Sequence, residues 1–439
     1  MRYEPIDTAL FIRNRQKIKE MLPKNALVVV NSNDELLRSG DQYYPFRQNS
    51  DLFYLSGLDQ EKCILTLSPD HPNEKFREII FTLKADDLIA TWNGHKYTKQ
   101  EVRAISGIET TLWLDDFEIT FRDLMAYADV VYLSQNEYIK LTNEVPLRDL
   151  RFAQKTRDAF PVHRYERLAP LLTELRLVKE PEEIALIRRA CDLTGSAFRR
   201  VLQFVAPGVM EYEVEAEMTH EFIRNGSSGH AYQPIIGSGS NGLILHYTSN
   251  HDRCHDGDLL LMDFGAEYAN YIADCTRTIP VSGRFTPRQR QCYEAVLRVM
   301  KQATAFFVPG HNPDFVTRET HKLMEKEMIG LGLFTQEQVD RQDPDKPLYF
   351  KYLMHGVSHP IGLDVHDVGS KYAPFKKGMV LTLEPGLYIP ADCKTVDEKW
   401  RGIGIRIEDD VLVTDQGHEV LTGGVPKTIT EIEALMQVA

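Results

Sequence analysis

Two aspartates stand close together in the stretch "LLLMDFGAEYANYIADCTRT", which covers residues 259–278. Asp263 ends an apolar, strand-like run, and Asp274 lies in a second strand-like run eleven residues later. If these runs form a hairpin centred between Tyr268 and Ala269, the two carboxylates face each other with Cβ atoms about 4.5 to 5.5 Å apart. Because like charges repel at that separation, the arrangement calls for a positive partner.

Two glutamates occupy similar positions later in the chain. Glu384 ends the apolar run of "VLTLEPG", and in "GIGIRIEDD" the alternation places Arg406 and Glu408 on one strand face, with isoleucines on the other. Buried acids are costly unless they are paired or metal-bound. Four such acids within about 4 Å would repel by a few kcal/mol per pair at an effective dielectric of about 20. Two divalent cations would cancel the four charges.

Histidines are concentrated in "MHGVSHPIGLDVHDVG", which holds His355, His359 and His366. The spacing of the first two would suit one helix face, but the glycines and proline among them disfavour a continuous helix of the zincin type. We expect instead a turn that leads into a strand around Val365. His246, in "LILHYT", is expected at the end of another apolar strand.

The chemistry of these groups follows from their types. A single strand acid is usually a solvated edge residue, and a histidine beside glycine or proline is usually structural, so the prediction rests on their convergence. Carboxylates with one imidazole suit manganese, or iron, cobalt or zinc, but neither copper nor an iron–sulfur cluster. Two such ions about 3.5 to 4 Å apart can hold a hydroxide and polarise a carbonyl oxygen, so hydrolysis is the predicted reaction.

Composition excludes several other classes of protein. The chain has 439 residues, which predicts two or three domains. The net charge of −13 without a basic block argues against a nucleic-acid partner. Six scattered cysteines without a paired motif indicate a reduced, cytoplasmic protein. We see neither a signal peptide nor an apolar run of membrane-spanning length, so no membrane partner is expected.

The first part of the chain alternates strand-like and helical stretches, which predicts an α/β domain. The strand-like runs are "ALVVVN", "KCILTL", "REIIFTL" and "DVVYLS". The pattern loses its regularity near Leu172, so we place domains at 1–172 and 173–439. A long helix is expected to begin at Pro181, and a second helix to end at Gly226.

The second part combines helices and strands in separate blocks. Strand-like text covers 232–279, 379–389 and 402–414, and helical text covers 286–307 and 314–330. This order predicts an α+β domain in which helices pack on one substantial antiparallel sheet.

These motifs resemble aminopeptidase P, the Xaa-Pro aminopeptidase of the pita-bread metallopeptidases, which also include prolidase and methionine aminopeptidase. The matching text is the aspartate stretch, "HGVSHPIGLDVHDVG", "VLTLEPGLYIP", "RGIGIRIEDDVLVT" and, near the N-terminus, "YPFRQNSDLFYLSGL". The resemblance implies an α/β N-terminal domain followed by an α+β C-terminal domain of the pita-bread (creatinase/aminopeptidase-like) fold. It also implies homodimers or homotetramers.

The resemblance further implies a ligand set for two divalent metal ions, with manganese as the first choice and cobalt, iron or zinc as alternatives. Asp274 and Glu408 would bridge the ions. The implied ligands are Asp263, Asp274, His359, Glu384 and Glu408.

The same resemblance implies a substrate and a mechanism. A metal-bridging hydroxide would attack the peptide bond before proline in a peptide with an Xaa-Pro N-terminus, and Glu384 would carry the proton. The groups expected to bind substrate, orient ligands and stabilise the oxyanion are His246, His355, His366 and Arg406. This chain departs from the family at Pro360, where an aromatic residue often follows the ligand histidine.

Two alternatives remain open at this point. Prolidase shares the metal chemistry but accepts only dipeptides that end in proline. A pita-bread binding module without catalysis, or a metal-free relative like creatinase, belongs to a different class. The five intact ligand positions argue against that class, because a chain without metal has little reason to retain four converging acids.

Overall fold

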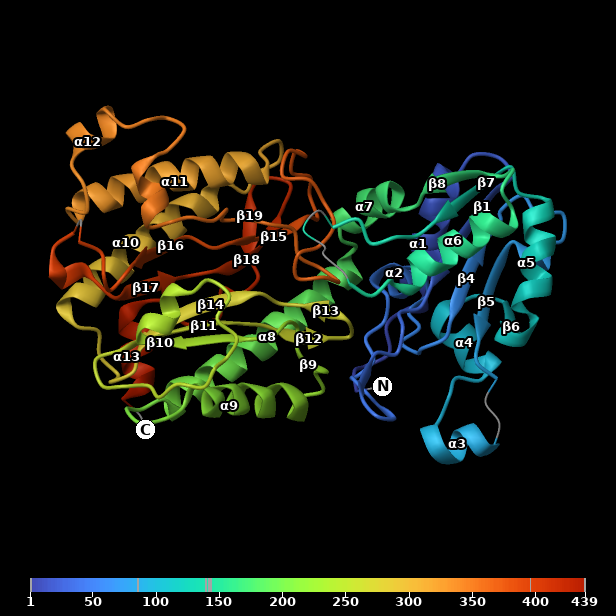
Figure 1. Cartoon of the computed structure of the whole chain (residues 1–439), viewed down its shortest axis with the longest axis horizontal. Coiled ribbons are helices and arrows are strands. Elements are labelled where there is room, and N and C mark those ends of the chain that lie inside the picture. Colours follow the sequence, from blue (N-terminus) through green and yellow to red (C-terminus); the bar gives the residue numbers. More distant parts are fainter. Residues whose placement is uncertain (1, 85–86, 139, 141–143, 395, 438–439) are drawn as a thin grey trace. The chain divides into compact units, whose positions relative to one another are not determined.

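The computed structural model describes residues 2–84, 87–138, 140, 144–394 and 396–437 (Figure 1). The chain forms two compact units, one spanning Glu4–Arg176 and one that begins at Leu177 and also includes Tyr3. The division falls at the end of α7 (Ala169–Leu177), shortly after the expected boundary at Leu172. Among the described residues, no helix is both long and apolar enough to cross a membrane.

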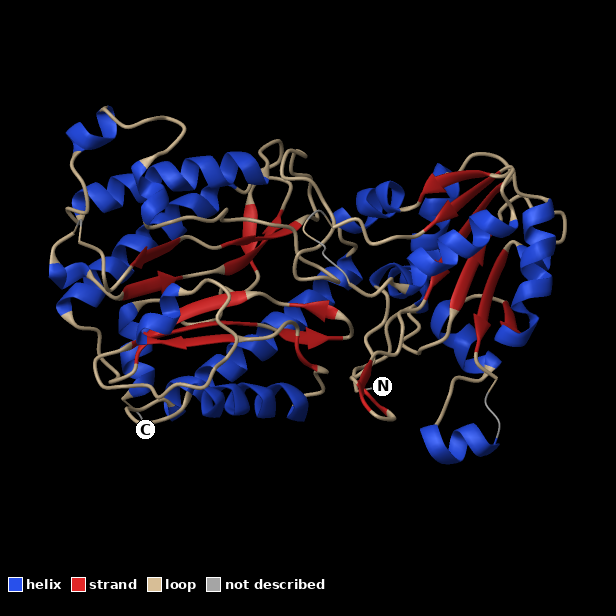
Figure 2. Cartoon of the chain, in the orientation of Figure 1, coloured by secondary structure: helices blue, strands red, loops and turns tan. Residues whose placement is uncertain are grey.

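The N-terminal unit is built around a mixed six-stranded sheet with the order β6-β5-β4-β1-β7-β8 (Figure 2). Strand β1 is buried along its whole length, as its continuous apolar run predicts. The strands are β1 (Ala26–Asn31), β4 (Ile64–Leu67), β5 (Glu78–Thr82), β6 (Thr110–Trp113), β7 (Val130–Leu133) and β8 (Arg164–Arg167). A separate small hairpin contains β2 (Leu37–Ser39) and β3 (Gln42–Tyr43).

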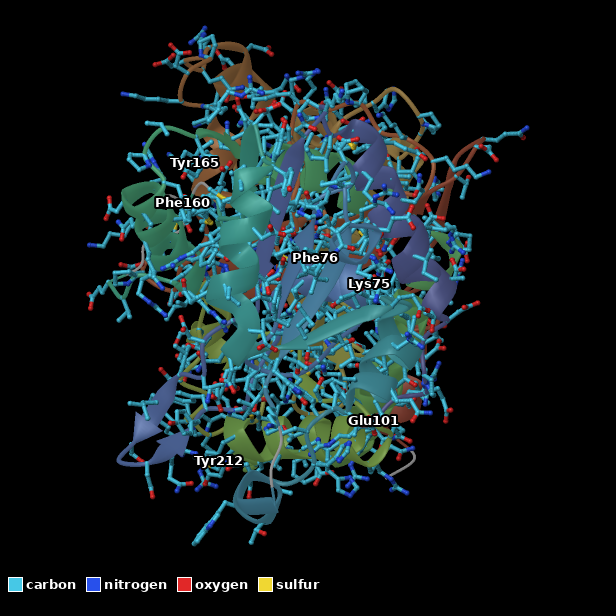
Figure 3. All side chains as sticks on the ribbon, turned by 90° about the vertical axis from the view of Figure 1, so that its right-hand side faces the viewer. Lys75, Phe76, Glu101, Phe160, Tyr165 and Tyr212 are labelled. Carbon is cyan, nitrogen blue, oxygen red and sulfur yellow. The ribbon has the colours of Figure 1, made fainter. Side chains whose placement is uncertain are left out.

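Helices complete the core of this unit, and the expected α/β architecture is confirmed. Phe117 and Phe121 of α5 pack against strand residues such as Phe81, with their ring centroids 5.1 Å apart. Phe160 and Tyr165, both labelled in Figure 3, pack at the edge of this cluster. The helices are α1 (Thr8–Met21), α2 (Ser50–Ser56), α3 (Asp87–Asn93), α4 (Lys99–Ser106), α5 (Phe117–Ala126) and α6 (Arg148–Ala159).

The C-terminal unit begins with two long helices that start and stop where the sequence indicates. Helix α8 (Pro181–Phe204) has Pro181 at its first position, and α9 (Glu211–Arg224) is followed by Gly226 with φ of 85°. The remaining helices are α10 (Pro287–Ala303), α11 (Pro313–Gly330), α12 (Gln336–Asp340) and α13 (Ile429–Met436).

The strands of this unit form four small antiparallel ladders in place of the single large sheet that we expected. The orders are β10-β11-β14, β13-β12-β9, β15-β18-β19 and β16-β17. The bounds are β9 (Gly229–His230), β10 (Ile235–Ser238), β11 (Leu259–Phe264), β12 (Ala266–Tyr268), β13 (Tyr271–Ile272), β14 (Cys275–Pro280), β15 (Val380–Leu383), β16 (Gly386–Ile389), β17 (Ile403–Arg406), β18 (Asp409–Val413) and β19 (His418–Val420).

The breaks between these ladders coincide with the four acids singled out in the sequence. Asp263 lies one residue before the end of β11, and Asp274 lies between β13 and β14. Glu384 follows β15 directly, and Glu408 precedes β18 directly. Three of the acids therefore lie just outside a ladder and Asp263 lies at the end of one, which lets the four side chains approach one another.

The hairpin that carries the two aspartates has a different register from the one we expected. Asp263 pairs with Thr276, not with Asp274, because the turn residues are Ala269 and Asn270, with φ of 53° and 64°. A two-residue turn of this kind needs positive φ at both positions, which asparagine tolerates better than tyrosine. Moving the turn by one residue along the chain shifts the partner of each strand residue by two positions. The two aspartates therefore stay on one face of the hairpin but lie diagonally across it, not directly opposite each other.

Two further expectations about strands are wrong. Val365 lies in a loop, because Asp367 N–H donates to Pro360 O and folds the histidine segment back on itself. His246 lies on an exposed turn after a 3₁₀ helix, η3 (Gly239–Leu243), and is not at a strand end. Strand β10 ends earlier, at Ser238.

Candidate metal centre

The two aspartates of the hairpin meet at the hydroxyl of a half-buried tyrosine. Tyr232 Oη lies 2.7 Å from Asp263 Oδ1 and 2.5 Å from Asp274 Oδ1. A phenol has a single hydrogen to donate, so it cannot satisfy both carboxylates at once. The tyrosine hydroxyl alone therefore does not offset the repulsion between the two carboxylates.

Asp274 and Glu408 are the most deeply buried acids of the group, with exposures of 4% and 2%. Burial, and next the charge of Asp263, raises the pKa of Asp274 well above its usual range. Burial, and next the charge of Asp274, does the same to the pKa of Glu408. Without added positive charge, protons must neutralise part of this cluster.

His359 faces the same space through one ring nitrogen. Its Nδ1 lies 3.1 Å from Pro360 O, and because a carbonyl can only accept, Nδ1 carries the hydrogen. Its Nε2 is left with a free lone pair 3.6 Å from Asp274 Oδ2 and 3.8 Å from Glu384 Oε1. Burial, with His366 as the second cause, lowers the pKa of His359 to about 4, so the ring is neutral at pH 7. Neutral imidazole is the form that binds metals.

Hydrogen bonds from the opposite side fix the acids. Arg406 Nη2 donates to Asp263 Oδ2 at 2.7 Å, and its Nε donates to Thr276 Oγ1 at 3.0 Å. Thr276 Oγ1 in turn donates to Glu408 Oε2 at 2.7 Å. These bonds link Arg406 and Glu408 through Thr276, although Glu408 lies between β17 and β18, whereas we expected it on the same strand as Arg406. Burial lowers the pKa of Arg406, but Tyr388 and Asp263 outweigh it and raise the pKa above the ordinary value.

His355 joins the centre through Tyr388 and Glu384. Its Nε2 lies 3.0 Å from Tyr388 Oη, which also accepts from Arg406 Nη1 at 2.9 Å. Its Nδ1 lies 2.8 Å from Gly356 O and 3.7 Å from Glu384 Oε2. Burial, and next the charge of Arg406, lowers the pKa of His355 to about 4, so this ring is also neutral.

The other two histidines are exposed at the edge of the centre. The rings of His366 and His359 are 4.6 Å apart and nearly perpendicular. His246 lies within electrostatic range of His355. The structure therefore brings together all nine residues singled out in the sequence, although it places His246 and His366 on irregular segments.

Three residues of the centre were not predicted, namely Tyr232, Thr276 and Tyr388. Thr276 could have been found, since it lies two positions after Asp274 and an extended chain returns to the same face with that period. Tyr232 lies in an irregular segment with no periodic pattern, so only the tertiary structure reveals its contacts.

The donor set fits divalent metal ions. Among the described residues, Asp274, His359 and Glu408 form a group whose possible ligand atoms all lie within 4.8 Å of one another. Asp263 and Glu384 adjoin that group through Tyr232 and His359. Oxygen donors with one imidazole nitrogen suit manganese, iron, cobalt or zinc. Cations would also remove the like-charge repulsion that raises the pKa values of Asp274 and Glu408.

Comparison with known proteins agrees with this geometry. The family model for metallopeptidase family M24 matches residues 185–415, and that for the aminopeptidase P N-terminal domain matches residues 11–132. The fold and the centre thus define a pita-bread metallopeptidase, and the chain belongs to metallopeptidase family M24.

Within that family the similarity is to aminopeptidase P. The chain is 38% identical to the Xaa-Pro aminopeptidase of Escherichia coli K12, over 98% of both chains. It is 30% identical to Xaa-Pro aminopeptidase 3 of Homo sapiens, over 96% of this chain and 84% of the human one.

Solved structures extend the similarity to the fold of the whole chain. The aminopeptidase PepP of Pseudomonas aeruginosa superposes with a TM-score of 0.90 at 31% identity, covering 99% of both chains. A glutamate-to-alanine variant of E. coli aminopeptidase P, solved in complex with substrate, has a TM-score of 0.88 at 35% identity and the same coverage. The expected family, fold and class of activity, a metal-dependent aminopeptidase, are confirmed.

Proposed function

We propose that this protein uses two divalent metal ions to release the N-terminal residue from peptides with proline in the second position. The observation that carries the proposal is the convergence of Asp274, His359 and Glu408, with Asp263 and Glu384 beside them, in a chain similar over its whole length to Xaa-Pro aminopeptidases.

Five residues would hold the ions. Asp263 would serve one ion, and His359 and Glu384 the other, with Asp274 and Glu408 shared between them. Manganese is our first choice, because oxygen donors dominate the set, with cobalt, iron or zinc as alternatives. Bound in this way, divalent ions supply an activated water molecule at neutral pH and polarise the scissile carbonyl group.

Glu384 is the proposed proton carrier. Its two carboxylate oxygens face His359 and His355 at 3.8 and 3.7 Å, so it lies inside the centre between the two rings. It would take a proton from the attacking water and deliver it to the leaving proline nitrogen. His355, fixed by Tyr388 and Gly356, would keep Glu384 oriented while remaining neutral.

The exposed histidines would contact the peptide. His246 and His366 stand at the edge of the centre, where a substrate main chain would enter, and either ring can donate to a developing oxyanion. Arg406 is engaged by Asp263 and Thr276, so we assign it to orienting the ligands. The bond before proline lacks an N–H and restricts its neighbour, so recognition needs a dedicated cleft. Pro360, next to His359, would shape that cleft.

A peptide panel tests this proposal. Metal-stripped protein, reloaded with manganese, cobalt or zinc in turn, is given Gly-Pro and a longer Xaa-Pro-Xaa peptide. We expect release of the first residue from the longer peptide. Exclusive turnover of Gly-Pro would favour a prolidase, and no turnover with any metal would favour a binding module.

We further propose that the protein works in the cytoplasm as a homodimer or homotetramer. The scattered cysteines support the location, and the family resemblance supports the assembly. Sedimentation velocity at micromolar concentration tests the assembly. A single monomeric species would contradict it.

A further inference from the structure

A buried glutamate outside the metal centre accepts an unusual number of hydrogen bonds. Glu211, the first residue of α9, is fully buried. Its Oε1 accepts from Ser238 N–H at 2.7 Å and from Asn241 Nδ2 at 3.1 Å. Its Oε2 accepts from Tyr247 Oη at 2.8 Å and from Asp252 N–H at 2.9 Å.

All four donors belong to one segment, residues 238–252. The two backbone donors, Ser238 and Asp252, stand at its two ends, and the two side-chain donors lie between them. Ser238 is the last residue of β10, and beyond it the segment contains the 3₁₀ helix η3 but no strand, so its own backbone supplies little to fix its shape. The Glu211 carboxylate therefore joins both ends of the segment, and Asn241 Nδ2 adds a bond within it to Asp252 Oδ2 at 2.7 Å.

This loop carries His246 and is packed against the strand that carries Arg406. A Cβ atom added at Gly404 of β17 would lie 2.5 Å from Gly242 O, so the two backbones touch there. His246 follows on the exposed side of the loop and lies within electrostatic range of His355.

We infer that Glu211 is a positioning residue that sets the place of His246 at the edge of the metal centre. The inference rests on the proposed function for its kinetic readout, because His246 is assigned there to the peptide substrate. The four residues that donate hydrogen bonds to Glu211 include none of the proposed metal ligands.

The two-oxygen geometry makes this role testable by a nearly isosteric change. In Glu211→Gln, one oxygen becomes an NH₂ group, which must face either Ser238 N–H or Asp252 N–H. One of the two backbone N–H groups then loses its acceptor, and the end of the loop that carries it is released. The neighbouring Glu215, one turn further along α9, accepts from Asn250 Nδ2 at 2.9 Å, and a glutamine there keeps an oxygen for that bond. Glu215→Gln is therefore the matched control.

The decisive experiment is a double-mutant cycle with His246→Ala, measured as kcat/KM on an Xaa-Pro-Xaa peptide in manganese. We expect Glu211→Gln to lower kcat/KM about tenfold when His246 is present and less than about twofold when it is absent. Metal content should stay unchanged in every variant. Glu215→Gln should change kcat/KM less than about twofold in both backgrounds.

Equal losses in the two backgrounds, or no loss in either, would overturn the inference. Should Glu211→Gln not fold, Tyr247→Phe removes one donor while both backbone bonds remain. We expect this variant to lower kcat/KM about threefold, again only in protein that retains His246.

If the wild-type protein turns over no Xaa-Pro peptide, the proposed function fails. Hydrogen exchange then decides the loop closure separately, since one of the two amides, Ser238 or Asp252, should exchange about tenfold faster in Glu211→Gln.

Discussion

At the scale of single residues, the centre separates groups that would hold metal from groups that would act on the peptide. His359 points the unprotonated Nε2 of its ring toward Asp274 and Glu384, whereas the exposed ring of His366 lies edge-on to the His359 ring. The two histidines are seven residues apart on one segment, yet their surroundings differ. Substitution of each should therefore have a different signature.

We expect His366→Ala to lower turnover while the bound metal stays near the wild-type level. The matched variant His359→Ala should lose metal, because it removes the imidazole donor. Metal analysis of both purified variants, alongside turnover of an Xaa-Pro-Xaa peptide, makes the comparison. Loss of metal from His366→Ala would refute its assignment to the substrate.

Tyr232 provides a second test at this scale. Its hydroxyl lies between Asp263 and Asp274, so it orients two proposed ligands without holding metal itself. We expect Tyr232→Phe to weaken metal binding by about 10- to 100-fold, as loss of ligand-orienting groups commonly does. Calorimetric titration of metal-stripped protein with manganese measures the change. An unaltered affinity would show that the aspartates keep their positions without the hydroxyl.

At the scale of the elements, close backbone contacts hold the strand ends together. Gly404 of β17 stands opposite Tyr388 in the ladder, and the place that a Cβ atom would take at Gly404 lies against Gly242 O. We expect Gly404→Ala to destabilise the protein by about 1 to 3 kcal/mol, because the methyl group overpacks that contact. Denaturant unfolding measures this.

The control for that substitution is Gly424→Ala. Nothing lies within 4 Å of a Cβ atom there, and its φ is not positive. Its free energy of unfolding should change by less than about 0.5 kcal/mol. Equal effects of the two substitutions would contradict the proposed close packing of β17.

The elements also show what the sequence could predict. Continuous apolar runs identified β1 and β15, and Pro181 marked the start of α8, because burial and the geometry of proline act locally. The hairpin register was missed because it depended on which residues accept positive φ, and Asn270 decided it. The His246 loop was taken for a strand because its shape depends on Glu211, which is distant in the sequence.

At the scale of the whole molecule, the two units contain separate buried acids. Asp149 of the N-terminal unit accepts from Asn31 Nδ2 at 2.8 Å and from Asn49 Nδ2 at 3.3 Å. Burial, which the Asn31 hydrogen bond only partly offsets, raises the pKa of Asp149 from 3.8 to about 7. The folded protein therefore keeps a proton on Asp149 at pH values where the unfolded chain has lost it.

This difference in the pKa of Asp149 between the folded and unfolded states determines how the free energy of unfolding changes with pH. As the pH rises from about 4 to about 7, Asp149 should lower the free energy of unfolding, with no further loss above that window. In Asp149→Asn the neutral side chain can donate to Asn31 Oδ1, which is buried and without a partner. We expect the thermal midpoint of this variant to fall less between pH 5 and pH 8. Asp158→Asn, an exposed change on the same helix, should keep the wild-type profile.

The proposed activity requires that the acids of the C-terminal unit hold cations that activate water. Four strand ends bring these acids together, and the family relationship spans nearly the whole chain. Hydrolysis should therefore require metal, and it should require Asp274, the acid proposed to bridge both ions.

The most direct measurement is turnover of an Xaa-Pro-Xaa peptide while manganese is titrated into metal-stripped protein, with Asp274→Ala measured beside the wild type. We predict that wild-type activity rises from zero to a plateau at two ions per chain. The folded variant should stay inactive at every manganese concentration. Turnover by metal-stripped wild-type protein, or by Asp274→Ala at saturating manganese, would contradict the account.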